Sequence, residues 1–332
     1  MRKEFPLVAV PDYSLCNEFC RNPRYKPLLT EAERKEEMAK QDKETRTLEG
    51  HLPPRYRGLI PINSLDFFGD AYLTSSDEVL KISGYGIAEK TQIISTHLEK
   101  RKLPALRVKE MLEGLEHYKW AFVSDFHGPS LDWFVFDSYP EYTGDLSLNL
   151  RRWGEIIATF ENANVELFDS HSSNYSSNGE NVIRIDLESI RWPTIPLELL
   201  DLNDMPWSDN KITRSSLKAR IKGHSAILST VCSLIDDLEK SEIIHYPEKY
   251  EFIAKNYLLE WGVHCKDEDY KNQQRKLITE IYQKSAEDVI RGYNSRIRKP
   301  CKISPEALKY ERSEAKLPLE VVLKNLGFNT KK

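Results

Sequence analysis

The segment Leu167–Glu188 reads LFDSHSSNYSSNGENVIRIDLE, and this stretch decides the fold that the sequence predicts. Within it, Ser177-Asn178-Gly179 has the composition of a hairpin turn, because Asn and Gly tolerate a positive φ at low cost. The run that follows, Val182–Ile185, is short and rich in β-branched residues, which is typical of a strand. We therefore expect a β-hairpin whose second strand returns toward the loop in which the segment begins.

Side chains with oxygen donors flank this predicted hairpin on both sides. Asp169 and Asn174 lie in the loop before it, and Asp186 follows the returning strand. Because the hairpin folds the chain back, the three side chains should converge. Hard Mg²⁺ prefers such oxygens, usually one or two carboxylates together with substrate phosphates. The alternative is a polar surface hairpin in which the Asp and Asn residues only form turns.

The spacing resembles the active-site core of the protein-kinase-like phosphotransferases, whose pattern is H-R-D-x-x-x-x-N followed by a strand and D-F-G. Leu167-Phe168-Asp169 stands at H-R-D, Asn174 at the asparagine, and Asp186-Leu187-Glu188 at D-F-G. The resemblance implies that Asp169 orients and deprotonates the attacking hydroxyl. It also implies that Asn174 and Asp186 hold Mg²⁺.

A second match lies earlier in the chain, where Val79-Leu80-Lys81-Ile82 is similar to the family's V-A-I-K. The resemblance implies that Lys81 binds the α- and β-phosphates of ATP. The alternative is a lysine on the solvent face of an edge strand.

The family's G-x-G-x-x-G-x-V falls on residues 64–71, where only Gly69 is retained, with Phe68 at the loop tip. Asp66 stands at another glycine position and would repel phosphate, so we expect weak nucleotide affinity.

The elements between these motifs follow the family's order. A helix is expected over residues 87–100 after a flexible link at residues 84–86, and Glu89 resembles the glutamate that pairs with the strand lysine. The alternative role for Glu89 is a favourable interaction with the helix dipole. Residues 105–112 and 118–126 are expected to form a strand pair. The strand pair leads to Asp125, Phe126 and His127, which resemble the hinge that offers backbone groups to adenine.

The predicted fold class is α+β, a bilobal protein-kinase-like fold with a small β-rich N-lobe and a larger, mostly helical C-lobe. We assign residues 1–60 to an N-terminal extension, 61–126 to the N-lobe, 127–305 to the C-lobe and 306–332 to a tail. Apolar spacing or composition predicts further helices over residues 29–48, 150–160, 215–240, 250–261 and 277–293. The basic residues Arg296, Arg298, Lys299 and Lys302 are expected to form a solvated face, with contact to an acidic substrate as the alternative.

Composition narrows the class of protein. The chain has 332 residues, of which 30% are charged and 40% hydrophobic, so we expect a globular protein. The net charge of −4 gives no sign of a nucleic-acid partner, and no apolar run reaches the length of a membrane span. The chain starts without a signal-peptide core, and its five scattered cysteines are expected to be reduced. A cytoplasmic or other intracellular location is therefore expected.

These matches predict an ATP- and Mg²⁺-dependent kinase that phosphorylates a hydroxyl acceptor. The loop Phe168-Asp169-Ser170-His171-Ser172-Ser173-Asn174 is similar to divergent microbial or phage-encoded protein kinases, which favours protein Ser/Thr as acceptor. Asp186-Leu187-Glu188 resembles the Asp-Phe-Glu of choline-kinase-like and aminoglycoside-kinase-like proteins, which keeps a small-molecule acceptor open. Two other interpretations remain, namely a pseudokinase that acts as a binding or scaffold module and an all-helical interaction protein that binds no nucleotide.

Overall fold

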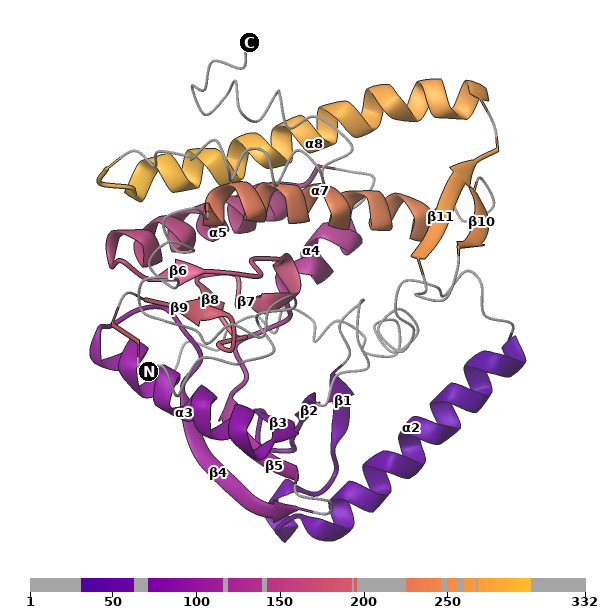
Figure 1. The fold of residues 1–332 in the computed structure, drawn as a ribbon. Coiled ribbons are helices and arrows are strands. Elements are labelled where there is room, and N and C mark those ends of the chain that lie inside the picture. The colour runs from indigo at the N-terminus through magenta and orange to yellow at the C-terminus, as the bar shows by residue number, and fades with distance from the viewer. Residues whose placement is uncertain are drawn as a thin grey trace, which may run out of the picture. The chain divides into compact units, whose positions relative to one another are not determined.

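The protein has an α+β fold that divides into two compact units, comprising residues 1–96 with 106–126, and residues 97–105 with 127–332 (Figure 1). In this computed structural model the described residues are 31–62, 71–115, 119–138, 142–192, 194–195, 225–245, 250–255, 260–266 and 268–299.

Unit 1 contains a five-stranded antiparallel sheet with the strand order β1-β2-β3-β5-β4. The strands are β1 (Ile60–Ile62), β2 (Ala71–Leu73), β3 (Glu78–Gly84), β4 (Val108–Leu115) and β5 (Lys119–Asp125). The predicted strand at residues 78–82 and the predicted strand pair are confirmed. The all-helical interpretation is wrong, because these five strands form a sheet. Strand alternation places Leu80 and Ile82 on the same face of β3, and both side chains are buried.

Helix α3 (Tyr85–Lys100) follows β3 directly. The predicted flexible link at residues 84–86 is therefore wrong, since Gly84 closes the strand and Gly86 lies in the first helical turn. One face of α3 is buried at Ala88, Ile94 and Leu98, a spacing that places the three side chains along one stripe.

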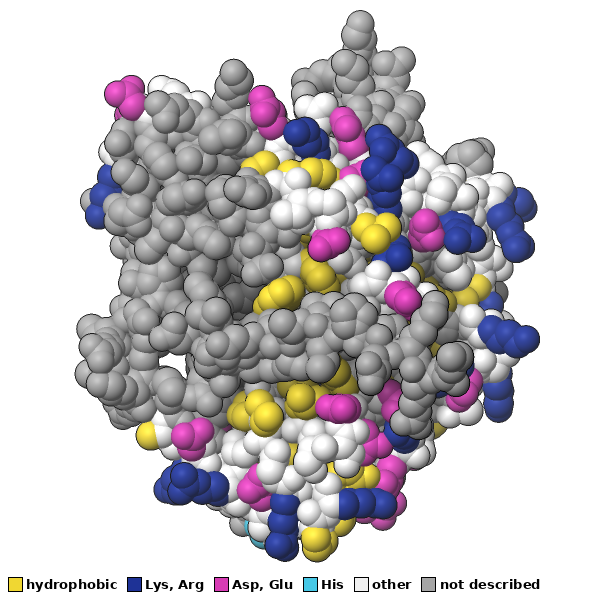
Figure 2. Space-filling view, turned by 180° about the vertical axis from the view of Figure 1, so that it is seen from behind, with side chains coloured by type: hydrophobic (Ala, Val, Ile, Leu, Met, Phe, Trp, Pro, Cys, Tyr) yellow, Lys and Arg dark blue, Asp and Glu magenta, His cyan; other side chains and the backbone are white. Residues whose placement is uncertain are grey.

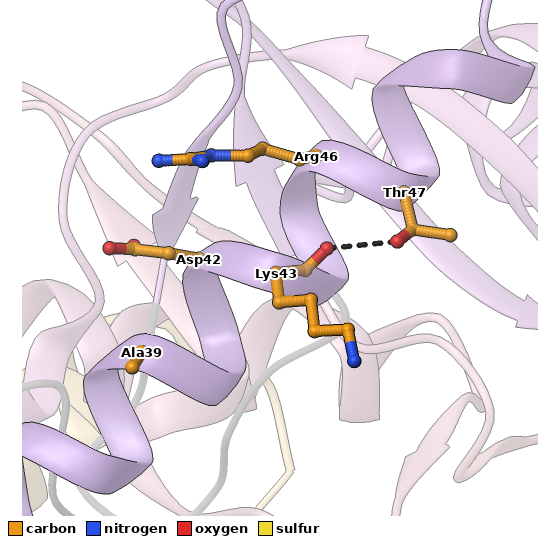
Figure 3. Close-up of a pocket in the computed structure, with 5 residues that line it drawn as sticks. All are labelled: Ala39, Asp42, Lys43, Arg46 and Thr47. Carbon is orange, nitrogen blue, oxygen red and sulfur yellow. Dashed lines mark hydrogen bonds between the residues drawn. The ribbon is translucent and has the colours of Figure 1, made fainter.

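Helix α2 (Glu31–His51) confirms the predicted charged helix at the N-terminal side. An open pocket along it is lined by Ala39, Asp42, Lys43, Arg46 and Thr47 (Figure 3). The Thr47 hydroxyl donates to the Lys43 carbonyl at 2.9 Å, and charges of both signs alternate along this face. Such a surface is typical of a solvated helix, and none of the predicted site residues lines this pocket.

The chain after α2 enters the core of the sheet. Leu52, Tyr56 and Leu59 pack in one buried cluster with strand residues such as Leu80 and Val123. The short 3₁₀ turn Pro54–Tyr56 directs the aromatic ring inward, and the Tyr56 hydroxyl donates to Glu110 at 2.6 Å. Residues that the sequence assigned to an extension thus contribute to the hydrophobic core of unit 1.

Unit 2 is mainly helical, with α4 (Leu131–Ser138), α5 (Gly144–Asn162), α7 (Ala226–His245) and α8 (Glu268–Arg296). Its short strands form three antiparallel pairs, β6 (Glu166–Leu167) with β9 (Ile190–Arg191), β7 (Tyr175–Ser177) with β8 (Val182–Arg184), and β10 (Tyr250–Lys255) with β11 (Glu260–Cys265). The predicted helix over residues 250–261 is therefore wrong. Its aromatic and β-branched residues suit paired strands, and their apolar content alone did not discriminate between strand and helix.

Helices α5 and α8 pack closely because each carries a glycine at the contact. A Cβ added to Gly154 would overlap the backbone of Val289, and one added to Gly292 would overlap the backbone of Arg151. Beside this contact, the Asp288 carboxylate accepts hydrogen bonds from Ser147 at 2.5 Å and from Arg151 at 2.7 Å. Close backbone approach and a hydrogen-bonded carboxylate therefore fix α8 against α5.

We predict that Gly154→Ala lowers the free energy of unfolding by about 2 kcal/mol or more, because the added methyl group forces the two helices apart. Gly144→Ala on the same helix is the control, since a Cβ there meets no atom within 4 Å. Chemical denaturation of the purified variants measures both effects. Equal stability of the two variants would contradict the packing described here.

Candidate functional site

The β7–β8 hairpin forms as the sequence predicts. Its register pairs Tyr175 with Arg184 and Ser177 with Val182. The Asn178 side chain accepts hydrogen bonds from the backbone N–H groups of Glu180 at 3.0 Å and Asn181 at 2.8 Å. Gly179 has a φ of +80°, a conformation that glycine adopts without steric cost.

The hairpin returns the chain to the loop that precedes it. The backbone N–H of Ile185 donates to the carbonyl of Asn174 at 2.9 Å, and the N–H of Asp186 approaches the same oxygen at 3.5 Å. The 3₁₀ turn η4 (Ser172–Asn174) connects this loop to β7. Asp169, Asn174 and Asp186, which the sequence places in two separate segments, therefore lie together.

The Asn174 amide is oriented by Asp169. Its nitrogen donates to the Asp169 carbonyl at 2.7 Å and to a carboxylate oxygen of Asp169 at 3.3 Å, and the residue is only 7% exposed. The amide oxygen of Asn174 and the half-buried carboxylate of Asp186, whose Oδ1 accepts from the Glu188 N–H at 3.5 Å, are oxygen donors of the kind that hard cations bind. No group of three or more His, Cys, Asp or Glu side chains with metal-site geometry occurs among the described residues, so a cation here would complete its shell with phosphate oxygens or water. Carboxylate and amide oxygens are donor types that Mg²⁺ accepts.

Asp169 occupies an unusual backbone conformation, with a φ of +52°. Non-glycine residues rarely adopt this region, although Asp tolerates it better than most residues, and such strain is concentrated at functional sites. The Asp169 side chain is 54% exposed, so its carboxylate remains accessible. The loop therefore holds an accessible carboxylate in a fixed, strained conformation.

His171 forms an ion pair with Asp169, with 2.6 Å between the imidazole Nε2 and a carboxylate oxygen. Its other ring nitrogen is 2.8 Å from the hydroxyl of Ser173. Burial alone would lower the pKa of His171, but the hydrogen bond and charge of Asp169, with the charge of Asp237, outweigh burial and raise it. Burial alone would raise the pKa of Asp169, but the His171 hydrogen bond and charge and the Arg184 charge lower it.

Arg184 holds the two segments of the site together, and sequence analysis did not identify it. Its guanidinium is fully buried and donates to the carbonyls of Asp186 at 2.5 Å and Asp169 at 3.1 Å, and to the Ser189 hydroxyl at 2.7 Å. The guanidinium also lies over the Tyr175 ring, 4.8 Å from its centroid. The sequence contained one sign of its burial, namely that Arg184 stands between two isoleucines in a short strand. Side chains alternate along a strand, so Arg184 lies on the same, buried face as Val182.

Helix α7 supports the loop from its buried side. The hydroxyl of Thr230 donates to Ser170 at 2.9 Å, and Ser170 in turn lies 2.6 Å from the Tyr175 hydroxyl. The Ser172 hydroxyl donates to the buried carboxylate of Asp237. The serines of the loop thus fix its backbone, while Asp169 and His171 remain partly exposed.

The remaining predicted residues lie in or next to unit 1. Lys81 is on β3, which pairs with β2 on one side and β5 on the other, so the edge-strand alternative is wrong. Glu89 is exposed on α3. Asp125 ends β5 and pairs with Lys109 at 2.9 Å.

At the predicted hinge, the backbone N–H of Phe126 donates to the Asp77 carbonyl at 3.1 Å. His127 is the first residue of this part of unit 2. Gly69 and Phe68, like Asp66, lie outside the described residues. The phosphate-binding loop therefore stays a prediction from the sequence.

No protein-family model matches the chain, and no curated protein matches its sequence. In the part of the chain that the structure describes, none of the helices combines the length and apolar character needed to cross a bilayer. The chemistry of the site is therefore inferred from its own residues.

The Asp169–His171 pair predicts a measurable pKa shift. We expect the ¹H NMR titration midpoint of the His171 imidazole to lie above 6.5, and Asp169→Asn to lower it, because the variant removes the hydrogen-bond acceptor and its charge. Asp42→Asn removes an exposed charge on α2, which belongs to the other unit, and serves as the control. A midpoint that Asp169→Asn leaves unchanged would contradict the pairing.

The pKa shifts of His171 and Asp169 also determine how the stability of the folded protein changes with pH. A histidine whose folded pKa is raised stabilises the folded state fully below its unfolded pKa, and this contribution is lost as the pH rises through the folded pKa. The lowered pKa of Asp169 adds a contribution that is lost as the pH falls through that folded pKa. The pair therefore stabilises the protein most in weak acid.

Proposed function

We propose that the protein is an ATP- and Mg²⁺-dependent phosphotransferase with a bilobal protein-kinase-like fold. The observation that carries the proposal is the convergence of Asp169, Asn174 and Asp186 through the β7–β8 hairpin. These residues supply a base and two oxygen donors within one loop–hairpin element. The position of Lys81 on an internal strand of the unit 1 sheet supports the proposal further.

Asp169 is the proposed base. Its accessible carboxylate orients the acceptor hydroxyl and takes its proton as the oxygen forms a bond to the γ-phosphorus of ATP. The bond from that phosphorus to the β–γ bridging oxygen breaks, and ADP leaves with the electron pair. The charge of Arg184 and the hydrogen bond from Asn174 favour the ionised form of Asp169, which is the form that accepts the proton.

Asn174 and Asp186 are the proposed ligands of Mg²⁺, and Lys81 is the proposed partner of the α- and β-phosphates. When bound, Mg²⁺ neutralises negative charge that develops on the phosphates. Phosphoryl transfer depends mainly on positioning and on charge neutralisation, and these residue types supply both. Glu89 is the proposed partner that orients Lys81.

A protein serine or threonine is the proposed acceptor, with a small-molecule hydroxyl as the second choice. The Asp169 side chain is 54% exposed, which leaves it accessible to a hydroxyl presented on a protein surface. The loop from Phe168 to Asn174, with its similarity to divergent microbial protein kinases, supports the same choice.

A pseudokinase is the second candidate function, because the proposed base is already engaged. Both carboxylate oxygens of Asp169 have partners, one in His171 at 2.6 Å and the other in Asn174 at 3.3 Å. Only one of the three lid glycines is retained in the sequence. Such a protein would bind nucleotide without transferring phosphate.

We predict that the purified chain transfers label from γ-labelled ATP in the presence of Mg²⁺, either to itself or to an added lysate fraction. Asp169→Asn should reduce transfer by about 100-fold or more, the usual contribution of a general base. Asp42→Asn, which removes an exposed acid on α2, should retain wild-type transfer. Separation of labelled protein from labelled small molecules identifies the acceptor class.

Thermal unfolding with Mg²⁺-ATP separates the two candidates. A ligand present at 100 times its Kd stabilises the folded state by about 2.7 kcal/mol, so even weak binding is detectable at high nucleotide. The phosphotransferase predicts both stabilisation and transfer, and Asp186→Asn should remove both. Stabilisation without transfer would indicate a pseudokinase, and the absence of both would refute nucleotide chemistry altogether.

A further inference from the structure

The C-terminal ends of α3, α5 and α8 lie in unit 2 and are joined by hydrogen bonds. The Arg101 guanidinium, in the turn after α3, donates to the carbonyl of Ala163 just past the end of α5. Asn162 at the end of α5 makes two hydrogen bonds with the C-terminal end of α8 and the residues that follow it. Its side chain donates to the Arg296 carbonyl at 2.8 Å and accepts from the Arg298 N–H at 2.9 Å. Segments from three distant parts of the chain are thereby joined around Asn162 and Ala163.

This junction concentrates positive charge. The exposed cations on it form what we call the basic end, and they are Lys100, Arg101, Lys102, Arg296, Arg298 and Lys299. Figure 2 draws Lys and Arg side chains in dark blue, and several lie at the right-hand side of the view, interspersed with Asp and Glu in magenta. The sequence revealed only the cations at the end of α8, because Lys100–Lys102 lie almost two hundred residues earlier.

Two kinds of interaction within the protein account for part of this charge. Arg296 pairs with Glu155 at 3.2 Å. Cations also stabilise helix C-termini, each of which carries roughly half a negative charge. The C-termini of three helices together carry about one and a half negative charges. This is less than the positive charge of the six cations that form the basic end.

Lys102 contributes a positive charge to the basic end from a backbone conformation that is unfavourable for lysine. It has a φ of +56° in the turn that closes α3, where the N–H of Leu103 donates to the Leu98 carbonyl at 3.0 Å. This position of a helix-terminal turn is usually glycine or asparagine, because other side chains are strained there. A lysine at the junction therefore adds charge where the backbone would favour a small residue.

The chemistry of the surroundings favours an acidic peptide over other anionic partners. Among the described residues, the aromatic side chains near the basic end, those of Phe160, Trp192 and Tyr293, are buried, so this part of the chain offers no exposed ring for stacking with unpaired bases. The large hydrophobic side chains exposed in the described part are Ile60, Ile93 and Leu148, and none of them belongs to the basic end, which leaves a membrane without an apolar anchor. The protein's net charge of −4 repels long nucleic acids, which are themselves negatively charged.

We propose that the basic end is a docking surface for an acidic segment of a partner protein. Arginine and lysine side chains from two segments offer charge-assisted hydrogen bonds to successive carboxylates. The proposal concerns binding alone and does not depend on phosphoryl transfer. The assay is therefore run without nucleotide.

The test is fluorescence anisotropy of a labelled octa-glutamate peptide with the full-length protein at low salt. We expect saturable binding that Lys100→Glu/Lys102→Glu and Arg298→Glu/Lys299→Glu each weaken by about tenfold, equivalent to about 1.4 kcal/mol. Lys40→Glu/Lys43→Glu on α2 makes the same change in net charge and should alter the Kd by less than about twofold, since these exposed lysines lie outside the basic end. Should a reversal variant fail to fold, the corresponding glutamine variants carry the test.

Three results would overturn the proposal. One is the absence of saturable peptide binding to the wild-type protein. Another is an equal loss of affinity in the α2 control, which would mean that net charge alone attracts the peptide. The third is tighter binding of a duplex oligonucleotide that the same variants abolish, which would assign the basic end to nucleic acid.

Discussion

The candidate site depends on one buried cation, the guanidinium of Arg184. A charge removed from water is costly unless hydrogen bonds replace its hydration. Here Nε and Nη2 of Arg184 donate to backbone carbonyls on both sides of the hairpin and to Ser189, the Tyr175 ring lies beside the guanidinium, and Nη1 is buried without a hydrogen-bond partner among the described residues. Because those carbonyls belong to Asp169 and Asp186, the interactions that make burial tolerable also hold the two acids in one place.

The helices of unit 2 provide a rigid base for this arrangement. Helix α5 contacts α8 without intervening side chains at Gly154 and Gly292, and α7 binds the loop serines through Thr230 and Asp237. The loop serines Ser170 and Ser172 are hydrogen-bonded and buried, whereas Asp169 is accessible. Asp169, the residue proposed to react, is also one of the four non-glycine residues with a positive φ in the described part of the chain, with Asp77, Lys102 and Asn164.

The local elements of the site could be predicted from the sequence because each has a short-range cause. Asn178-Gly179 specifies a turn, and Val182–Ile185 favours a strand, so the hairpin and the convergence of Asp169, Asn174 and Asp186 followed. The role of Arg184 was not predicted because it donates to backbone carbonyls. Every residue has a backbone carbonyl, so the residue types in the sequence do not identify these partners. The β10–β11 hairpin was mistaken for a helix because a short apolar run satisfies both periodicities.

The most direct test of the account uses Mn²⁺ in place of Mg²⁺, because a paramagnetic ion broadens the NMR signals of nuclei near it. In protein labelled with ¹⁵N at Asn and Asp, Mn²⁺ with ATP should broaden the backbone amide signals of Asn174 and Asp186, and Asp186→Asn should remove the effect. Sharp signals from both residues at saturating Mn²⁺-ATP, or broadening confined to acids elsewhere such as Asp42 on α2, would contradict the account.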